Sequence, residues 1–287
     1  MRFGPPNPLQ SSLLLTGAGP SNGASFVGAL DGYASSISRL WCPGKRLLSS
    51  WSGNAGTLRE TTGSTEQTFG FTGASQYLDT SGITSFLSGA GASAAAWKLV
   101  YDQKGSGDDL TQTTAASQPL YVGSHSGFNN RACVHLDDLT TKGMAATLDV
   151  VRPYTIVVVE DDDGTLHSLR TVSAYTGTAT LENNLICSNR SGLTFYRLGT
   201  VSTTQTALPC VAALTGPSSG NHKAYCNATD ITTASLASGD WRKLALGRAP
   251  GGTEGAKTKV FALIVFNTAL TAGDLTALQT ILAPASL

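Results

Sequence analysis

Short runs of β-branched and aromatic residues recur along the whole chain, and Gly, Pro or Asn separates one run from the next. They follow one another at intervals of roughly 8–12 residues, a spacing typical of β-sandwiches and jelly rolls. Strands do not alternate with helices as in parallel α/β folds, and no internal repeat is found. The sequence therefore predicts an all-β fold. The runs include "EQTFGFTG", "GLTFYRLG", "ALPCVAALTG", "NHKAYCNATDI", "WRKLALGRA" and "KTKVFALIVFNTAL".

The segment "RPYTIVVVEDDDGTLHSLRTV" is the clearest of these runs. Its apolar stretch from Thr155 to Val159 predicts a buried strand. The Asp-Asp-Asp-Gly sequence that follows is typical of a tight turn, and the alternating residues after it predict a return strand. The segment is therefore expected to form a β-hairpin, with Asp161, Asp162 and Asp163 in its turn.

Helical patterns are found in two places. In "DGYASSISRLWCPG", Tyr33, Ile37, Leu40 and Trp41 recur at helical spacing, and Pro43 would stop the helix. In "LTAGDLTALQTILA", Thr271 and Asp274 form a capping-box pattern before a stripe of apolar residues. The sequence predicts two short helices.

The composition favours one domain with an extended arm. Charged residues make up 13% of the 287 residues, against about 25% in typical soluble domains, and Gly, Ser, Thr and Ala replace them. No segment is a convincing linker, so residues 25–287 are expected to form one sandwich. Residues 1–24 are rich in Pro, Gly and Ser and predict an arm that makes an assembly contact.

Charge and hydropathy exclude several classes of function. The formal net charge is zero and the basic residues are scattered along the sequence. The sequence therefore predicts no positively charged surface that could bind the phosphates of a nucleic acid. No apolar run approaches the roughly 18 residues needed to span a bilayer. The apolar part of the first 20 residues is too short for a signal peptide, so export by the usual secretory route is not expected. We predict neither a nucleic-acid partner nor a membrane partner.

Five cysteines are widely spaced, and none belongs to a C-x-x-C pair or a zinc-binding pattern. They can serve as buried thiols that pack as small apolar groups, or they can form one or two disulfides. The sequence does not decide between these alternatives.

Three acidic clusters are the strongest candidates for chemistry: Asp108–Asp109, Asp137–Asp138 and Asp161–Asp163. Glycoside hydrolysis needs two facing carboxyl groups roughly 5–10 Å apart. Adjacent residues of one strand point to opposite faces, so no single cluster supplies the pair. Asp137 and Asp138 are expected in a loop or bulge, where a calcium site is an alternative.

Other site patterns are weak. The four histidines show no metal-binding spacing, and no nucleotide-binding motif lies between a strand and a helix. Trp97 and Trp241 begin predicted strands, where core or rim positions are expected and a sugar-stacking role is the alternative. We predict no metal and no required cofactor, with calcium as the exception noted above.

The segments "WKLVYDQKGSGDDLTQTTAASQPLYV" and "SISRLW…KRLLSSWSG" resemble the family typified by the catalytic domain of fungal α-L-arabinofuranosidase B. Relatives of that domain occur in phage and prophage structural proteins. The tail "WRKLALGRAPGG…KVFALIVFNTALTAGDL" resembles the closing strands of laminin-G-like modules. The resemblance covers about residues 30–122 and 220–283, and it implies a concanavalin-A-like jelly-roll sandwich.

The residues that match the family are scaffold residues, and the family's catalytic residues have no counterpart in this sequence. In the family the nucleophile lies in a segment with adjacent cysteines and a glutamate, and this chain has no Cys-Cys pair and no Glu between Glu66 and Glu160. By comparison with the family, the loop "YDQKGSGDDLTQ" (residues 101–112) is interpreted as a structural clasp, in which short acidic side chains accept hydrogen bonds from backbone N–H groups. The residues that carry over are Tyr101, Asp102, Gln103, Gly107, Asp109, Leu110 and Gln112.

The resemblance and the composition together predict a non-enzymatic virion protein of a tailed phage, assembled in the host cytoplasm. It would be a decoration, collar or fibre subunit that contacts other virion proteins through its arm, forms a homo-oligomer and binds a cell-surface glycan. Relatives tend to carry an aliphatic residue at the position of Cys226, so an interchain disulfide there is an alternative to a buried thiol. Two alternatives stay open: a glycoside hydrolase or depolymerase of arabinofuranosidase type, and a soluble carbohydrate-binding module.

Overall fold

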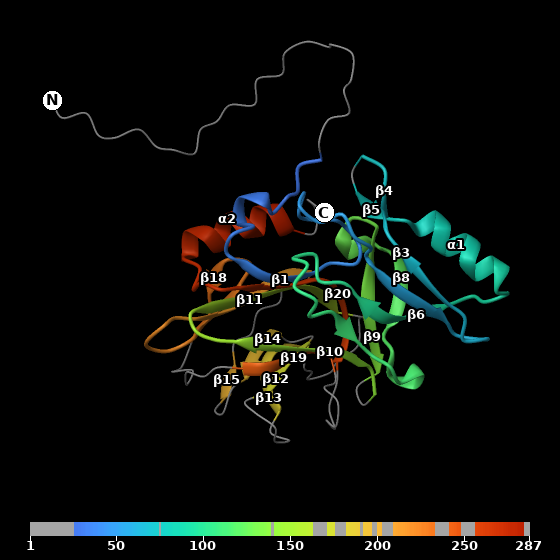
Figure 1. Cartoon of the computed structure of the whole chain (residues 1–287). Coiled ribbons are helices and arrows are strands. Elements are labelled where there is room, and N and C mark those ends of the chain that lie inside the picture. Colours follow the sequence, from blue (N-terminus) through green and yellow to red (C-terminus); the bar gives the residue numbers. More distant parts are fainter. Residues whose placement is uncertain are drawn as a thin grey trace, which may run out of the picture.

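The computed structural model describes residues 26–74, 76–138, 141–162, 171–175, 182–189, 192–196, 200–202, 209–232, 241–247 and 256–283. Two β-layers lie face to face, and helix α2 (Ala272–Leu282) lies over the outer side of one of them (Figure 1). The neighbouring strand pairs are antiparallel, as sandwich topology requires. The prediction of an all-β sandwich with two short helices is confirmed.

The first layer is built around the long strand β20 (Ala256–Phe266). Strand β11 pairs with one side of β20, while β9 and β1 pair with the two halves of its other side. The hairpin of β17 and β18 extends the layer beyond β16. Its strands are β1 (Ile37–Trp41), β8 (Leu120–His125), β9 (Arg131–Asp138), β11 (Tyr154–Asp162), β16 (Cys210–Gly216), β17 (Lys223–Cys226), β18 (Thr229–Asp230) and β20.

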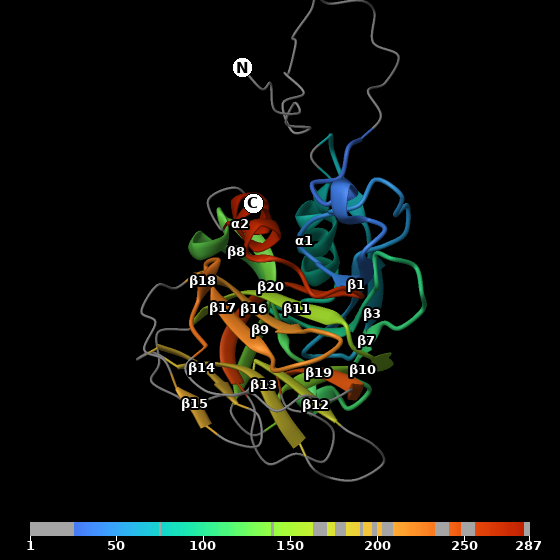
Figure 2. The same ribbon diagram turned by 90° about the vertical axis from the view of Figure 1, so that its left-hand side faces the viewer.

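Part of the second layer lies beneath β1 and β11 in Figure 1, and the layer is seen from another side in Figure 2. One pair, Ala96 with Leu120, joins the two layers. In sheet order its strands are β3 (Glu66–Phe69), β2 (Gly56–Glu60), β6 (Ala95–Val100), β7 (Leu110–Thr111), β10 (Gly143–Val150), β19 (Trp241–Gly247), β12 (Val172–Tyr175), β13 (Glu182–Asn189), β14 (Gly192–Tyr196) and β15 (Thr200–Ser202).

Alternation along the strands creates two cores. In β11, Ile156 and Val158 face the space between the layers, while Val157 and Val159 face outward. The outward residues are buried because α2 and the segment around Leu30 cover that face. A strand that is buried on both faces has a nearly continuous run of apolar residues, which explains the sequence "TIVVV".

Helix α2 forms where the capping-box pattern predicts it. The side chain of Thr271 accepts the backbone N–H of Asp274, and the carboxylate of Asp274 accepts the backbone N–H of Thr271 at 3.0 Å. Leu275, Leu278 and Leu282 are buried in the outer core. The cap and the apolar stripe therefore explain both the start and the placement of α2.

The other predicted helix is wrong. After a short 3-10 turn at Asp31–Tyr33, the chain forms strand β1, which pairs with the last residues of β20. Over so short a run, the apolar residues fit the repeat of a helix as well as that of a strand. The segment forms a strand because it pairs with the long central strand β20. The second helix is instead α1 (Thr80–Gly89), capped by the Asp79 carboxylate, which accepts the backbone N–H of Gly82 at 2.9 Å.

The predicted hairpin around Asp161–Asp163 is also wrong. Strand β11 continues through Asp162, and its partners are β16 and β20. Most of the predicted return strand, and Asp163 of its turn, lie outside the described residues; the next described strand, β12, pairs with β13 and β19 in the other layer. The chain therefore crosses between layers after β11.

Four smaller elements complete the description. They are the strand pair β4 (Phe71–Thr72) and β5 (Tyr77–Leu78), and the 3-10 turns η2 (Ala115–Ser117) and η3 (Ser126–Phe128). Within the ranges given above, neither helix is long and apolar enough to cross a membrane. The predicted arm of residues 1–24 lies outside the described residues, and the division at residue 25 stays a prediction.

Candidate functional site

The loop that carries the family resemblance is held by Asp102, whose side chain is buried. Its Oδ1 accepts the backbone N–H of Leu40 at 2.8 Å and that of Lys104 at 3.0 Å. Its Oδ2 accepts both the backbone N–H and the hydroxyl of Ser106. Because these donors occupy both oxygens, Asp102 ties the loop to β1 and leaves no oxygen for a substrate.

The neighbouring Gln103 makes the same kind of connection. Its Oε1 accepts the backbone N–H of Leu47 at 2.8 Å, and its Nε2 donates to the carbonyls of Cys42 and Lys45. All three partners lie in the segment that follows β1. Gln103 is buried, and its three hydrogen bonds fix that segment against the loop.

The remaining residues of the loop also have structural positions. Asp109 Oδ1 accepts the backbone N–H of Asp102 at 2.8 Å, and burial raises the pKa of Asp109. Gly107 has a positive φ of 84°, and Leu110 is buried at the start of β7. Gln112 donates to the carbonyl of Gly143, and Tyr101 donates its N–H to the carbonyl of Ala55.

A second polar group lies where β9 and β11 end and β20 begins, on the outer side of the first layer. Strand register places Asp161 opposite Lys259, and Lys259 opposite His135. Asp137 lies opposite Lys257, one step further along the same face. Together with His125, we call these residues the polar face: His125, His135, Asp137, Asp161, Lys257 and Lys259.

The turn η3 contacts the polar face at Asp161. His125 Nε2 lies 2.8 Å from Asp161 Oδ2, in position to donate its N–H. Phe128 is buried beside the His125 ring, with ring centroids 5.0 Å apart. Gly127 leaves no room for a side chain, since an added Cβ would overlap Asp161 Oδ2 and lie 2.9 Å from His125 Nε2.

The adjacent residue Glu160 points the other way, into the core between the layers. It is fully buried, and Thr171 Oγ1 donates to its Oε2 at 2.6 Å. Its register partner in β16 is Cys210, which is also fully buried. β11 thus places one acid in the inner core and the next on the polar face.

The structure brings two of the three acidic clusters together. Asp137 and Asp161 stand on strands that flank β20, on the same face, while Asp108 and Asp109 lie in the separate loop. The sequence could not show this, because the pairing joins segments far apart in the chain. Asp137 and Asp138 are the last residues of β9, so their expected position in a loop or bulge is wrong.

The structure tests the sugar-stacking alternative for Trp97 but not for Trp241. Trp97 is 0% exposed and its Nε1 donates to the carbonyl of Cys133 at 3.4 Å, so its proposed stacking role is wrong. Trp241 begins β19, and its side chain lies outside the described residues, as does that of Asp138.

Metal binding finds little support in the described parts of the chain. Within them, no group of three or more His, Cys, Asp or Glu side chains is arranged to hold a metal ion. The side chains of Asp138 and Asp162 are outside that search. The calcium site stays a prediction.

The alternative of an interchain disulfide at Cys226 is wrong. Cys226 is 0% exposed and packs in the core between the layers, where another chain has no access. Its position in β17 opposite Ala212 explains the burial, since that face of the strand turns toward the second layer.

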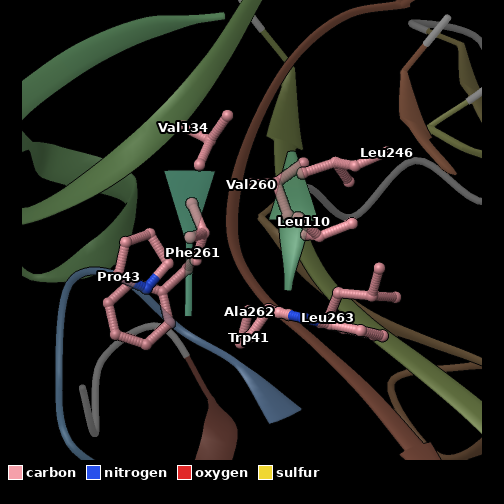
Figure 3. Close-up of a pocket in the computed structure, with 10 residues that line it drawn as sticks. Trp41, Pro43, Leu110, Val134, Leu246, Val260, Phe261, Ala262 and Leu263 are labelled. Carbon is pink, nitrogen blue, oxygen red and sulfur yellow. The ribbon is translucent and has the colours of Figure 1, made fainter. Parts of the chain in front are cut away.

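A small apolar cavity lies where β1, β7 and β20 meet (Figure 3). It has about 10 Å³ of space, roughly what one water molecule needs. Because its walls offer apolar side chains, it suits neither a sugar nor an ordered water. The lining residues are Trp41, Pro43, Val100, Leu110, Val134, Leu246, Val260, Phe261, Ala262 and Leu263.

Comparison with known proteins gives matches to solved structures. No family model and no curated protein matches the chain. A glutamate-to-glutamine mutant of a GH54 α-L-arabinofuranosidase soaked with 4-nitrophenyl α-L-arabinofuranoside is 15% identical, with a TM-score of 0.70 over 91% of this chain and 66% of that one. An arabinofuranosidase complexed with arabinofuranosyl-α-1,2-xylobiose is 14% identical, with a TM-score of 0.68 over 91% and 65%.

A GH54 α-L-arabinofuranosidase soaked with a cyclic sulfate inhibitor matches as well, with 15% identity and a TM-score of 0.62 over 91% of this chain and 66% of that chain. The chain thus spans slightly less than two thirds of the length of these enzymes. At such identities the likeness shows a shared fold.

These matches correct the functional expectation from the sequence. The chain was expected to be a non-enzymatic virion protein, and three solved structures whose fold it shares across 91% of its length are arabinofuranosidases. The virion interpretation and the exclusion of an enzyme are therefore contradicted. The resemblance that suggested them was carried by scaffold residues, which enzymes and non-enzymes of one fold share.

Proposed function

We propose that this chain is a glycoside hydrolase of the arabinofuranosidase type. The observation that carries the proposal is the shared fold with GH54 α-L-arabinofuranosidases over 91% of the chain. Within that fold we place the chain among concanavalin-A-like jelly rolls, as its sequence motifs suggest. Since one fold can host several functions, the polar face must supply the chemistry.

Asp161 and Asp137 are the two carboxyl groups that we assign to the reaction. They stand on one face, two strands and one register step apart, which separates their Cα atoms by about 12 Å at ordinary strand spacing. Side chains pointing toward each other over Lys259 can shorten that distance to the roughly 6.5–9.5 Å of an inverting hydrolase, where a water fits between the groups. This arrangement differs from the nucleophile of the family that the sequence resembles, so the proposal concerns the same substrate class with another pair of acids.

The two acids have different surroundings, which suits two different roles. His125 donates toward Asp161 and orients it, so Asp161 is the base that activates water. One oxygen of Asp137 is closed off from solvent and has no hydrogen-bond partner among the described residues. The residue as a whole is only partly buried, and we assign Asp137 as the acid that protonates the leaving group.

The test is hydrolysis of 4-nitrophenyl α-L-arabinofuranoside, followed by the absorbance of released 4-nitrophenolate. We expect turnover by the wild-type chain, and a loss of at least about 100-fold in kcat/KM for Asp161→Asn and for Asp137→Asn. Asp149→Asn is the matched control, because Asp149 is exposed in β10 and far from the polar face in the sheet order.

The outcomes separate the function from the site. If the wild type releases no sugar from this substrate or from arabinose-containing polysaccharides, the proposed function is wrong. If the wild type turns over and both variants keep its rate, the hydrolase stands and the assignment of Asp161 and Asp137 is wrong. Binding of a polysaccharide without cleavage would favour the carbohydrate-binding alternative.

Expectations about assembly are independent of this test. We retain homo-oligomer formation and contact with a cell-surface glycan as proposals. Sedimentation of the purified chain tests the first, since a monomer at all concentrations contradicts it.

A further inference from the structure

Two cysteines lie together in the core between the layers, on adjacent strands β16 and β17. Register pairs Ala212 with Cys226, so Cys210 stands two residues beyond that pair on the same strand face. Both cysteines are 0% exposed, and both belong to the cluster of residues that fills the space between the layers. They are diagonal neighbours on one face of an antiparallel pair.

The two thiols are neighbours. Cys210 and Cys226 are both free thiols, and strand register brings their side chains to the same face of adjacent strands. The neighbouring Cys226 side chain and burial raise the pKa of Cys210 well above its ordinary value. Glu160, the register partner of Cys210, adds a third polar group at the same point of an otherwise apolar core.

We propose that Cys210 and Cys226 form an intrachain disulfide under oxidising conditions. The sequence left thiols and disulfides as alternatives and offered no partner for Cys226, whereas strand register supplies one. The bond would join β16 to the β17–β18 hairpin at its inner face, beside Glu160. Diagonal neighbours have Cα atoms about 7–8 Å apart, so forming the bond requires β16 and β17 to move closer together at this point.

The oxidant is a low-molecular-weight disulfide such as oxidised glutathione. The Cys226 thiol loses a proton to solvent, and its sulfur attacks one sulfur of the oxidant, releasing one glutathione thiol. Cys210 then loses its proton and attacks the mixed disulfide at the Cys226 sulfur, releasing the second glutathione. Two thiols of the chain are oxidised and one glutathione disulfide is reduced to two thiols, so electrons and protons balance.

Access to the buried pair requires the hairpin to open. Strand β17 has four residues, and its only partner besides β16 among the described strands is the two-residue strand β18. Short edge strands open more readily than central ones. The structure therefore supports slow oxidation of the folded chain and direct formation of the bond during folding.

The test counts thiols on the intact chain. Purified protein is equilibrated in glutathione buffers from fully reduced to fully oxidised, then denatured, alkylated and weighed. The chain has five cysteines, so we expect five alkylated thiols under reduction and three after oxidation. Peptide mapping without reduction should link the segments that contain Cys210 and Cys226. The oxidised chain should melt about 5–10 °C higher, because the bond closes a loop of roughly 15 residues.

Variants identify the pair. Cys226→Ala should keep four thiols in both buffers, whereas Cys42→Ala, which removes another fully buried cysteine, should fall from four to two. A wild-type count of five after full oxidation overturns the proposal. So does a stable glutathione adduct, or a link between any other two cysteines. The wild-type measurement decides even if a variant fails to fold.

Discussion

The carboxylate of Asp102 accepts the backbone N–H of Leu40 at 2.8 Å, across 62 residues of sequence. Leu40 lies in β1, and its N–H points toward the loop that follows β6. The same side chain also accepts backbone N–H groups of Lys104 and Ser106 within its own loop. One buried carboxylate thus joins a tight turn to a distant strand.

Replacing Asp102 with Ala should lower the free energy of unfolding by about 1–3 kcal/mol. The substitution removes the acceptor for three backbone N–H groups, and a buried donor without a partner costs its full desolvation energy. Urea denaturation followed by tryptophan fluorescence measures the change.

The exposed Asp149 supplies the control for this substitution. Asp149→Ala should change stability by no more than about 0.5 kcal/mol, since Asp149 is exposed. A melting temperature unchanged by Asp102→Ala, together with lost ligand binding, would show that Asp102 serves a ligand instead of the loop.

Local patterns predicted those parts of the fold that depend on near neighbours. Helix α2 begins at its capping box, and the strand from Thr155 to Val159 is found within β11. The segment of β1 was predicted to be a helix because Ile37, Leu40 and Trp41 fit a helical face as well as a strand. The segment forms a strand because it pairs with Leu263–Phe266, more than 200 residues away, and such a distant pairing cannot be recognised from the neighbouring sequence.

The same limit applies to the candidate site. Short acids beside glycines indicated the turn of the Asp102 loop, since that interaction is local. The polar face depends on the register of β9, β20 and β11, which brings Asp137 and Asp161 to one side of the sheet. Each cluster considered alone resembled a turn, and only the sheet order shows that they are neighbours.

Stability should depend on the ionisation of Glu60. Its carboxylate accepts the hydroxyl and the backbone N–H of Thr62 and the backbone N–H of Thr65. These hydrogen bonds, that of the Thr62 hydroxyl above all, lower the pKa of Glu60 from 4.5 to about 2. A lowered pKa stabilises the folded state above pH 4.5, and this contribution disappears as the pH falls from about 4.5 to about 2.

Comparing the wild type with Glu60→Gln across pH tests this dependence. The difference in urea midpoint between the two proteins should be constant from pH 7 to about 4.5 and should shrink toward pH 2. Thr62→Ala removes the hydroxyl donor and so lowers the pKa of Glu60 less, and its loss of stability with acid should be smaller and should be complete at a higher pH. A difference that stays constant down to pH 2.5 would contradict the proposed role.

Gly127 should tolerate no side chain. A Cβ at this position would overlap Asp161 Oδ2 and press on His125, so Gly127→Ala must displace the Asp161 carboxylate and the His125 ring or the turn that carries them. We expect a loss of about 1–3 kcal/mol in the free energy of unfolding, as for other overpacked sites. Gly89→Ala is the control, because nothing lies within 4 Å of an added Cβ at the end of α1. If both variants unfold at the same urea concentration, η3 is free to move and the contact is unimportant.

Filling the apolar cavity should stabilise the fold. Val100 is fully buried and lines the cavity, so Val100→Ile adds one methylene to space that is empty. Burying a methylene contributes about 0.8 kcal/mol, and we expect a gain of about 0.5–1 kcal/mol in the free energy of unfolding.

Val157→Ile adds the same group to a fully buried site that does not line the cavity, where overpacking should cost about 1–3 kcal/mol. Both substitutions exchange one β-branched residue for another in a central or near-central strand, so intrinsic strand propensity is nearly unchanged. Opposite signs in thermal and urea denaturation therefore report packing, and equal losses would mean that the wall of the cavity cannot accept a methylene.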